Sequence, residues 1–565
     1  MEIRIKKTNK KINLTKSNFV SRGGEGKIFA KNGVAYKIYD DKKKMIPFSK
    51  IQELSRISDP NVIKPENILT NKSGEKIGYS MKYVANTYLL CQIFAKSFRN
   101  RHNISNKTVL NLIQKMQSTI SHIHSKDILI VDLNEMNFLI DKSFKEIYFI
   151  DVDSYQTHNF PATAIMESIR DWSSPNFNQL TDWFSFGIIS FHMFCLIHPF
   201  KGKHPSLKGL EERMMANIPV FHKDVRYPKS CLSFDVIPQS YKNWYKAMFH
   251  EGKRLPPPID IVEAIIIVQP IQTIIGNEQF DIKETFDYKD EIYEYISVDG
   301  IRIAKVRDGN IFVNQKLEFN TNYSYISISP RSNHIICCGI DVSEGLGDGK
   351  LRVFNITESK ELSCSINAEE IMDYEGRVFI KNKSTISEID FVETPNNTQV
   401  TCVVVANVLE KATKFFHGGV IQNILGSFFI SLFPERKNHY QIKMDELNGY
   451  QIIEAKYENK VLIIIGSKKG KYDKFIFKFN ENYSSYSLRK VENISYVGIN
   501  FTVLDNGIVV HINEQEEVEV FSNKKDSSKI KIIDNNVING DMKLYKDGTQ
   551  VLFSKGNKMY RLKMK

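Results

Sequence analysis

The chain has 565 residues, a length that exceeds a single folding unit and predicts three or four. Hydrophobic residues make up 42% and charged residues 25% of it, which excludes a wholly disordered or fibrous chain. No apolar run reaches the roughly 18 residues of a membrane span, and the basic N-terminus lacks the apolar core of a secretion signal. The seven cysteines form no C-x-x-C pair, so we expect no disulfide framework, no zinc ribbon and a cytoplasmic location.

The net charge of +12 is concentrated at one end of the chain. Residues 1–50 contain 14 Lys or Arg against 4 Asp or Glu. A surface that contacts phosphate or an acidic partner would account for this excess, and so would a solvated face. Aromatic side chains are not interleaved with the basic ones as base stacking requires, so nucleic-acid binding is disfavoured.

Residues 18–40 show two strand-like runs around a glycine-rich turn. The turn contains Gly23, Gly24 and Gly26, and Lys37 lies on the next strand. Glycines let the backbone approach phosphates closely, and a lysine offers them a positive charge. An ordinary hairpin with an exposed lysine would look the same, so a phosphate site is indicated only if further motifs lie downstream in the chain.

A helical pattern at residues 108–124 leads into a polar segment. Within this segment Asp132 lies five residues before Asn137. An apolar strand then ends in Asp151, nineteen residues after Asp132. Helices therefore follow strands, which is the order of an α+β domain.

These motifs together resemble the protein kinase superfamily: a glycine loop, a strand-three lysine, a D-x-x-x-x-N catalytic loop and a metal-binding aspartate, in that order and spacing. Residues 181–187, TDWFSFG, look like the start of the central C-lobe helix, and His198-Pro-Phe and Arg254 resemble later C-lobe features. The G-G-E-G and D-V-D-S motifs are similar to those of divergent bacterial and phage eukaryotic-like Ser/Thr kinases. The resemblance covers about residues 15–270.

The resemblance implies an α+β protein-kinase-like bilobal fold, with an N-lobe at residues 1–85 and a C-lobe at 86–270. After residue 270 the periodicity changes to short alternating strands separated by Gly, Asn, Asp and Lys. Residues 275–565 are therefore predicted to be an all-β domain, a six- or seven-bladed β-propeller. A pair of β-sandwiches is the alternative, and each half is long enough for its own core.

The resemblance also implies roles in phosphoryl transfer. Asp151 and Asn137 would hold Mg²⁺, Lys37 would contact the α- and β-phosphates of ATP, and Asp132 would orient the attacking hydroxyl or accept its proton. Gly23, Gly24 and Gly26 would lie over the phosphates.

The adenine is expected at residues 81–84. Met81 would be the gatekeeper, and Tyr83 and Val84 would belong to the hinge. His124 is expected to tie the catalytic loop to Asp182 of the following helix.

Several positions depart from the kinase pattern. Ile130-Val131 replaces His-Arg, so the arginine that would receive an activation-loop phosphate is missing. Asn134 replaces the catalytic-loop lysine, and Asp153 stands at the glycine of Asp-Phe-Gly. Residues 174–176 replace Ala-Pro-Glu, which leaves Arg254 without its usual glutamate.

The helix-C glutamate that pairs with the lysine in this fold is also uncertain from the sequence. Glu53 is the nearest carboxylate, whereas strict spacing to Pro60 places Lys50 there. The sequence leaves Glu53 or no glutamate at all as the partner of Lys37.

Two functions are consistent with this pattern. The first is an ATP- and Mg²⁺-dependent Ser/Thr protein kinase whose β domain recruits a protein substrate or partner. The second is a pseudokinase scaffold that binds nucleotide and protein without phosphoryl transfer. Retention of Lys37, Asp132, Asn137 and Asp151 favours the enzyme, and the changes at Val131 and Asn134 favour the scaffold.

Overall fold

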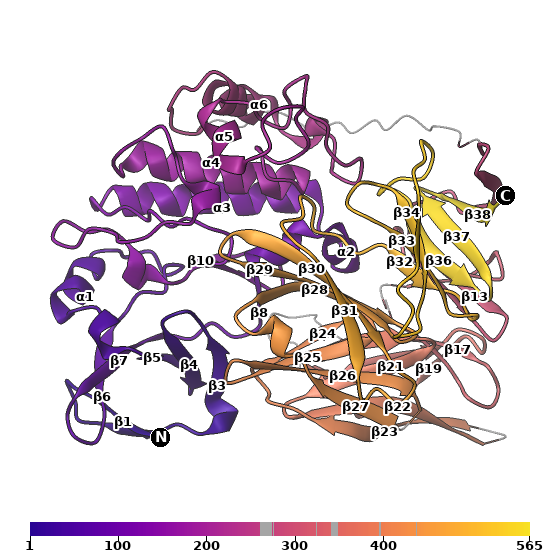
Figure 1. Ribbon diagram of the computed structural model, residues 1–565. Helices are drawn as coiled ribbons and strands as arrows, with labels where there is room; N and C mark the ends of the chain where they lie inside the picture. Colours follow the sequence, from indigo (N-terminus) through magenta and orange to yellow (C-terminus); the bar gives the residue numbers. More distant parts are fainter. Residues whose placement is uncertain are drawn as a thin grey trace.

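The structure is a computed structural model that describes residues 1–259, 274, 276–321, 323, 325–340, 349–394, 397–436 and 438–565. Two α+β lobes come first in the chain, and a large β region follows and packs beside them (Figure 1). The predicted junction near residue 270 lies outside the described residues.

The N-terminal lobe is built on one seven-stranded sheet with the strand order β2-β1-β6-β7-β5-β4-β3. Asn32 and Gly33 join its central hairpin, and both have positive φ angles, of 51° and 74°. This is the conformation that a two-residue Asn-Gly turn requires. A single short helix, α1 (Phe48–Leu54), lies beside the sheet. The strands are β1 (Glu2–Ile5), β2 (Lys11–Asn13), β3 (Phe19–Arg22), β4 (Gly26–Lys31), β5 (Val34–Tyr39), β6 (Asn67–Thr70) and β7 (Lys76–Lys82).

The C-terminal lobe is mainly helical, and its longest helix is α3 (Asn106–His124). The predicted 108–124 helix is thereby confirmed. Ser105 caps it by accepting a 3.1 Å bond from the amide of Thr108, and its apolar stripe is buried. The other elements are α2 (Lys96–Arg101), α4 (Gln179–Cys195), α5 (Leu210–Met215), α6 (Gln239–Tyr245) with a π-helical turn (Lys246–His250), and a sheet of β8 (Thr87–Leu89), β9 (Phe138–Asp141) and β10 (Ile147–Phe149).

The β region consists, over its described residues, of seven four-stranded antiparallel sheets, which confirms the all-β prediction. Six sheets use four consecutive strands, whereas the seventh combines β11 (Phe280–Asp287) with the last three strands of the chain. The first two sheets are β12 (Ile292–Val298), β13 (Ile301–Val306), β14 (Asn310–Val313) and β15 (Lys316–Asn320), then β16 (Tyr325–Ile328), β17 (Ile335–Ile340), β18 (Leu351–Asn355) and β19 (Lys360–Leu362).

The remaining strands continue the same order along the chain. The third and fourth sheets are β20 (Glu370–Tyr374), β21 (Arg377–Asn382), β22 (Thr385–Thr394) and β23 (Asn397–Asn407), then β24 (Thr413–Phe416), β25 (Gly419–Ile424), β26 (Ser427–Glu435) and β27 (Asn438–Lys443). The fifth and sixth are β28 (Gln451–Glu458), β29 (Val461–Lys468), β30 (Lys471–Phe479) and β31 (Tyr486–Val491), then β32 (Phe501–Val503), β33 (Ile508–Ile512), β34 (Val518–Ser522) and β35 (Ile530–Ile533). The seventh ends with β36 (Lys543–Asp547), β37 (Gln550–Lys555) and β38 (Lys558–Met564).

The apolar core of the C-terminal lobe extends into the β region. The cluster that contains the buried faces of α3 and α4 also includes Ile453, Ile465, Tyr472, Ile494 and Val497. The two halves therefore share a core at this contact, in addition to the separate cores of the other sheets. The five shared side chains fix the sheet β28–β31 against the lobe that carries Asp132.

Candidate active site

Lys37 lies on β5 of the N-terminal lobe and bonds to Asp151 and Asp153 of the C-terminal lobe, and this meeting point of the two lobes is called the cleft below. The side chain of Lys37 is only 8% exposed. The ammonium Nζ lies 2.7 Å from Oδ2 of Asp153, 3.0 Å from Oδ1 of Asp151 and 3.4 Å from Oε2 of Glu25. Burial alone would lower the pKa of Lys37, but Tyr79 and the two aspartates outweigh it and raise the pKa well above its ordinary value. The lysine is therefore charged and surrounded by acceptors.

Asp153 is the most enclosed of these acceptors, with a residue exposure of 4%. Besides Lys37 it accepts a 2.6 Å bond from the Tyr39 hydroxyl and a 2.7 Å bond from the Tyr79 hydroxyl. Burial would raise its pKa, but Lys37 and the two hydroxyls lower it below the ordinary value. Asp153 is thus an ionised group in the interior of the cleft.

Helix α1 brings Lys50, and not Glu53, to this cluster. Nζ of Lys50 donates a 2.7 Å bond to the backbone oxygen of Asp153. Glu53 points away and accepts a 2.6 Å bond from the side-chain amide of Asn159. Of the two alternatives that the sequence left open, Glu53 or no glutamate as the partner of Lys37, the structure agrees with the second, and it places Lys50 where the strict spacing to Pro60 did.

The catalytic loop is held by Asp182, a fully buried residue of α4. Its carboxylate accepts bonds of 2.8 and 2.9 Å from the amides of Ile130 and Val131, and Nε2 of His124 lies 2.9 Å from it. The predicted tie between His124 and Asp182 is confirmed. Val131 has a φ of 64°, a conformation costly for a β-branched residue, which these amide bonds support.

Asp132 projects from this loop and its carboxylate is enclosed by amide donors. Oδ2 accepts a 2.9 Å bond from Nδ2 of Asn134, and Oδ1 accepts a 2.9 Å bond from the backbone amide of Met166. Nδ2 of Asn137 donates to the backbone oxygen of Asp132 at 2.9 Å. The residue that replaces the usual lysine, Asn134, therefore fixes the orientation of Asp132.

Asp151 follows β10 and lies between Lys37 and the catalytic loop. The backbone oxygen of Asn137 accepts a 2.9 Å bond from the amide of Ile150, which joins the two segments. Asp151 has a φ of 59°, a left-handed conformation often found at functional sites. Burial and the neighbouring Asp153 raise its pKa to about 6, against the opposing effect of Lys37.

The donor set at Asn137 and Asp151 fits Mg²⁺. Because Nδ2 of Asn137 is used by Asp132, its oxygen is the atom left for a metal, and Asp151 adds a carboxylate. Such hard oxygen ligands, with water and phosphate oxygens, are what Mg²⁺ prefers. Within the described ranges, no group of three or more His, Cys, Asp or Glu could hold a metal by protein side chains alone. Phosphate oxygens would have to complete the shell.

The glycine loop fits a phosphate-bearing ligand. A Cβ added to Gly23 or Gly24 would meet no heavy atom within 4 Å, so the loop opens onto free space. At Gly26 the same atom would lie 2.2 Å from the backbone oxygen of Ile38. Only glycine is therefore accommodated at Gly26, where the hairpin packs against its neighbour.

The expected hinge lies at the end of β7, between the lobes. Met81 pairs with Ala35 of β5, and the amide of Tyr83 donates a 3.0 Å bond to the oxygen of Gly33. Val84 follows directly in the chain. These three residues lie where the chain passes from the N-terminal to the C-terminal lobe, next to the strand that carries Lys37.

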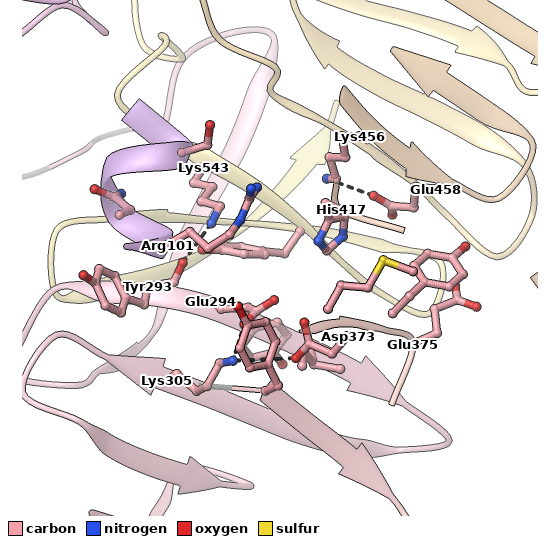
Figure 2. A pocket seen from close by; sticks show the side chains of 18 of the residues that line it. Arg101, Tyr293, Glu294, Lys305, Asp373, Glu375, His417, Lys456, Glu458 and Lys543 are labelled. Carbon is pink, nitrogen blue, oxygen red and sulfur yellow. Dashed lines mark hydrogen bonds and ion pairs between the residues drawn. The ribbon is translucent and has the colours of Figure 1, made fainter. Parts of the chain in front are cut away.

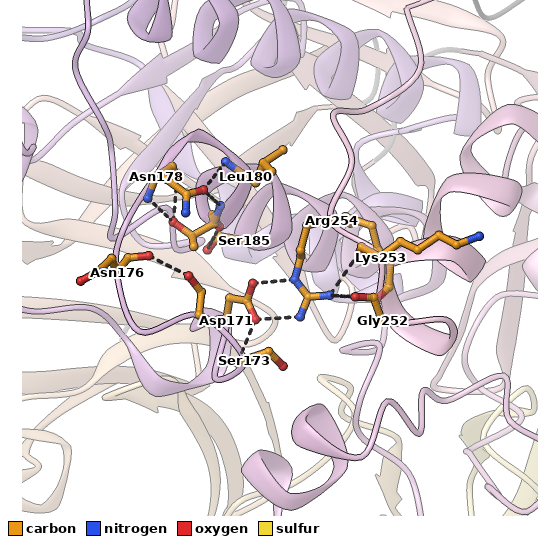
Figure 3. Close-up of polar contacts among 12 residues, drawn as sticks. Asp171, Ser173, Asn176, Asn178, Leu180, Ser185, Gly252, Lys253 and Arg254 are labelled. Carbon is orange, nitrogen blue, oxygen red and sulfur yellow. Dashed lines mark hydrogen bonds and ion pairs between the residues drawn. The ribbon is translucent and has the colours of Figure 1, made fainter.

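Arg254 has a carboxylate partner that the sequence interpretation missed (Figure 3). Its Nε and Nη2 donate bonds of 2.5 and 2.7 Å to the two oxygens of Asp171, which has a side-chain exposure of 2%. Asp171 precedes the 174–176 segment in which a partner was expected. The bidentate pair anchors the activation segment, residues 151–176, to the C-terminal lobe.

The β region contacts the middle of the activation segment. At the turn between β29 and β30, a Cβ on Gly470 would lie 2.6 Å from Oγ of Ser168 and 2.8 Å from Sδ of Met166. Nearby, the hydroxyl of Tyr472 bonds to the carboxylate of Glu135 in the catalytic loop. The β29–β30 hairpin therefore supports the segment whose amide caps Asp132.

A cavity of about 470 Å³, lined by many charged residues, lies where the β region faces α2 (Figure 2). Lys305 pairs there with Glu294 and lies 3.7 Å from Asp373, and Lys456 lies 3.0 Å from Glu458. The charged groups that line this cavity are mostly balanced by one another. Nothing in the sequence pattern singled out these residues.

The site residues found from the sequence are those carried by local motifs. The structure brings Lys37, Asp132, Asn137 and Asp151 to one cleft, with the glycine loop beside it. It adds contacts made by Glu25, Tyr39, Tyr79, Asp153 and Asp171, which were not assigned a role.

The lysine, the catalytic loop and the glycine loop thus belong to one bilobal α+β domain. Residues 19–252 match the family model described as the protein kinase domain. The chain therefore contains a protein kinase domain, followed by an all-β region of many strands. A search of the curated proteins found no match to this chain. None of the helices in the described part of the chain combines the length and apolar character of a membrane span.

Proposed function

We propose that the protein is an ATP- and Mg²⁺-dependent protein kinase that phosphorylates serine or threonine side chains. The observation that carries this proposal is the convergence of Lys37, Asp132, Asn137 and Asp151 on one cleft, with Lys37 and Asp151 3.0 Å apart. A structural ion pair would explain the lysine and the aspartate. It would not explain the catalytic-loop geometry around Asp132 beside the open glycine loop.

The mechanism assigns each group to one task. Lys37 binds the α- and β-phosphates, and the glycine loop covers them with backbone amides. Bound Mg²⁺, held by Asn137 and Asp151, would neutralise charge on the phosphates. An oxygen of Asp132 accepts the hydrogen bond, and then the proton, of the substrate hydroxyl. Asn134 keeps that oxygen in place, although it brings no positive charge.

The experiment is transfer of labelled γ-phosphate to the protein itself or to a generic acceptor, with wild type and Asp132→Ala compared. We expect the variant to lose at least a hundredfold in rate, because a positioned acid–base group contributes about 10²–10⁴. Asp235→Ala is the matched control, since that carboxylate lies on the C-lobe surface with its side chain 82% exposed. Equal labelling of wild type and Asp132→Ala would contradict the proposal.

A second candidate, a pseudokinase scaffold, is favoured by one observation. Both carboxylate oxygens of Asp132 already accept hydrogen bonds, from Asn134 and from the amide of Met166. A substrate hydroxyl would have to share Oδ1 with the amide of Met166 or Oδ2 with the side-chain amide of Asn134. Binding of Mg·ATP without any γ-phosphate transfer, under conditions that vary the acceptor, would support the scaffold over the enzyme.

We further propose that the β region, residues 275–565, is a seven-bladed propeller that recruits a protein substrate or partner. Seven successive four-stranded sheets support seven blades, and the pairing of β11 with β38 supports closure of the ring. In this proposal residues 1–85 and 86–270 form the two kinase lobes. A crystal structure of the full chain with the sheets in an open row would contradict the propeller.

A further inference from the structure

The groups around Lys37 come from the sheet, from the segment after β10 and, at 3.4 Å, from Glu25 of the glycine loop. Tyr39 lies on β5, two residues after Lys37, and Tyr79 on β7 is the register partner of Lys37. Asp153 accepts from both tyrosine hydroxyls and from Lys37 within 2.6–2.7 Å. None of these bonds joins Lys37 to a side chain of α1.

In protein kinases generally, the strand-three lysine is paired with a glutamate of helix C, and that pair must be in place for activity. Here α1 occupies the helix position, but its Lys50 donates to the backbone oxygen of Asp153, and its Glu53 bonds to Asn159. The lysine is therefore still on its strand, whereas the buried carboxylate that pairs with it comes from the segment after β10 and not from the helix. The carboxylate is now two residues after Asp151.

We propose that Asp153 is the positioning residue of this active site, holding the Lys37 ammonium where it meets the phosphates of ATP. The inference rests on the proposed kinase function and adds to it how the lysine is held. Because Asp151 and Asp153 belong to one segment, the metal carboxylate and the lysine carboxylate are placed together. The lysine site is then formed without a carboxylate from helix α1.

Asp153 is not arranged as a metal ligand. Its Oδ1 accepts from Tyr79, its Oδ2 accepts from Tyr39 and Lys37, and the residue is 4% exposed. Three donors therefore surround the two oxygens. A metal ion could take the place of one of them only if a buried side chain moved. Asp151, by comparison, has a side chain that is 42% exposed.

The test measures binding of Mg·ATP and of adenosine to the full chain by calorimetry. The variants are Asp153→Asn, Lys37→Met and the double variant, and Glu53→Gln is the matched control. We expect Asp153→Asn to weaken Mg·ATP at least tenfold and adenosine by less than twofold, because Lys37 contacts only phosphate. In the Lys37→Met background the same change should cost less than twofold, because the lysine that Asp153 positions is gone. Glu53→Gln should change neither affinity by more than twofold.

The outcomes separate the inference from the function on which it rests. If wild type binds no Mg·ATP, the kinase proposal and this inference both fail. If wild type binds but Asp153→Asn weakens Mg·ATP equally with and without Lys37, the inference alone is overturned. A loss caused by Glu53→Gln instead of Asp153→Asn would also overturn it.

A second variant covers the case in which Asp153→Asn does not fold. Tyr79→Phe removes one hydroxyl from Asp153 and leaves the charges intact. We expect it to weaken Mg·ATP about threefold with adenosine unchanged, and to have no further effect once Lys37 is methionine. An unchanged Mg·ATP affinity in folded Tyr79→Phe protein would count against the positioning role.

Discussion

Two regions of the molecule contain nearly the same arrangement of charge. In the cleft, Lys37 lies between Asp151 and Asp153. In the cavity of the β region, Lys305 lies between Glu294 and Asp373. Each cluster has one largely buried lysine between two carboxylates.

The protonation properties of the two clusters also correspond. In both, burial and the second carboxylate raise the pKa of one acid to about 6, namely Asp151 and Asp373. In both, burial would raise the pKa of the other acid, but the lysine outweighs burial and lowers it. This acid is Asp153 in the cleft and Glu294 in the β region, where the pKa falls to about 2. Perturbed pKa values alone therefore do not distinguish the two sites.

The difference lies in what surrounds each cluster. Glu294 and Lys305 face one another across β12 and β13, and Asp373 of β20 accepts a 2.8 Å bond from the amide of Ile326 in β16. The β-region cluster therefore connects three successive sheets. The cleft cluster instead faces the open glycine loop. Because the β-region cluster also lines a cavity of about 470 Å³, access to a ligand does not separate the two clusters, and the glycine loop and catalytic loop beside Lys37 are what mark the first as a candidate catalytic site.

The largest effect is expected for the lysine in the β region. Lys305→Met would leave Glu294 and Asp373 without their buried cation, so we expect the free energy of unfolding to fall by about 3–5 kcal/mol. Lys316→Met, on the same sheet with its side chain 79% exposed, should change it by less than about 0.5 kcal/mol. Urea denaturation measures both. Equal effects would show that the cluster does not stabilise the sheets, and the comparison would fail.

The Arg254–Asp171 pair has one carboxylate for one cation, whereas each of the two clusters has two carboxylates for one lysine. It therefore shows what a buried ion pair contributes to stability when no second carboxylate is present. Asp171→Asn leaves the guanidinium short of a charged partner, and we expect a loss of about 2–3 kcal/mol. Asp235→Asn, which disrupts the exposed pair with Lys242, should cost less than about 0.5 kcal/mol. Thermal and urea unfolding of both variants decide this, and a similar small loss in each would contradict a structural role for Asp171.

The surplus carboxyl of the β-region cluster should have a pH signature. The pKa of Asp373 is raised from its ordinary 3.8 to about 6 by burial and by Glu294, against Lys305. The folded state therefore retains this proton between about pH 4 and 6 while the unfolded state loses it, so stability falls as pH rises through that window.

Asp373→Asn keeps an oxygen for the amide of Ile326 and removes the titration. We expect the variant to gain about 2–3 kcal/mol on wild type between pH 4 and pH 7. Urea titrations at a series of pH values measure this difference. Parallel pH profiles for the two proteins would mean that Asp373 does not titrate in this range.

The smallest effect concerns phosphorylation of the activation segment. Lys37 of the cleft cluster is already paired with Asp151 and Asp153. Val131 replaces the arginine that would bind a phosphate added to the activation segment. Changing Thr163, Ser173 and Ser174 together to Ala should leave phosphoryl transfer within about threefold, or about 0.7 kcal/mol. A hundredfold loss that acidic substitutes restore would show that another cation, with Arg170 the nearest in sequence, binds a phosphate there.

The sequence predicts those parts of the fold and site that depend on spacing along the chain. The Asn32-Gly33 hairpin, the helix ending at His124 and the D-x-x-x-x-N loop are local patterns, and the structure has all three. Asp153 and Asp171 are different, because their partners are 116 residues and 83 residues away. A charged residue in a loop gives no sign of which distant cation it will meet.

The contact between the two halves also could not be read from the sequence. Ile465 and Tyr472 are alternating strand residues like many others in the β region, and nothing local shows that they face the C-lobe. The change of periodicity near residue 270 indicates two architectures. It does not reveal that the core of one continues into the other.

The pairing of β11 with β38 has a consequence for how the chain is made. Residues 280–287 leave the ribosome roughly 270 residues before their partner strand, a delay on the order of 15–55 s at common rates of synthesis. During that interval β11 is an unpaired strand that can associate with a wrong edge. A chain that lacks residues 558–564 leaves β11 without this partner, and such a chain should aggregate or be degraded.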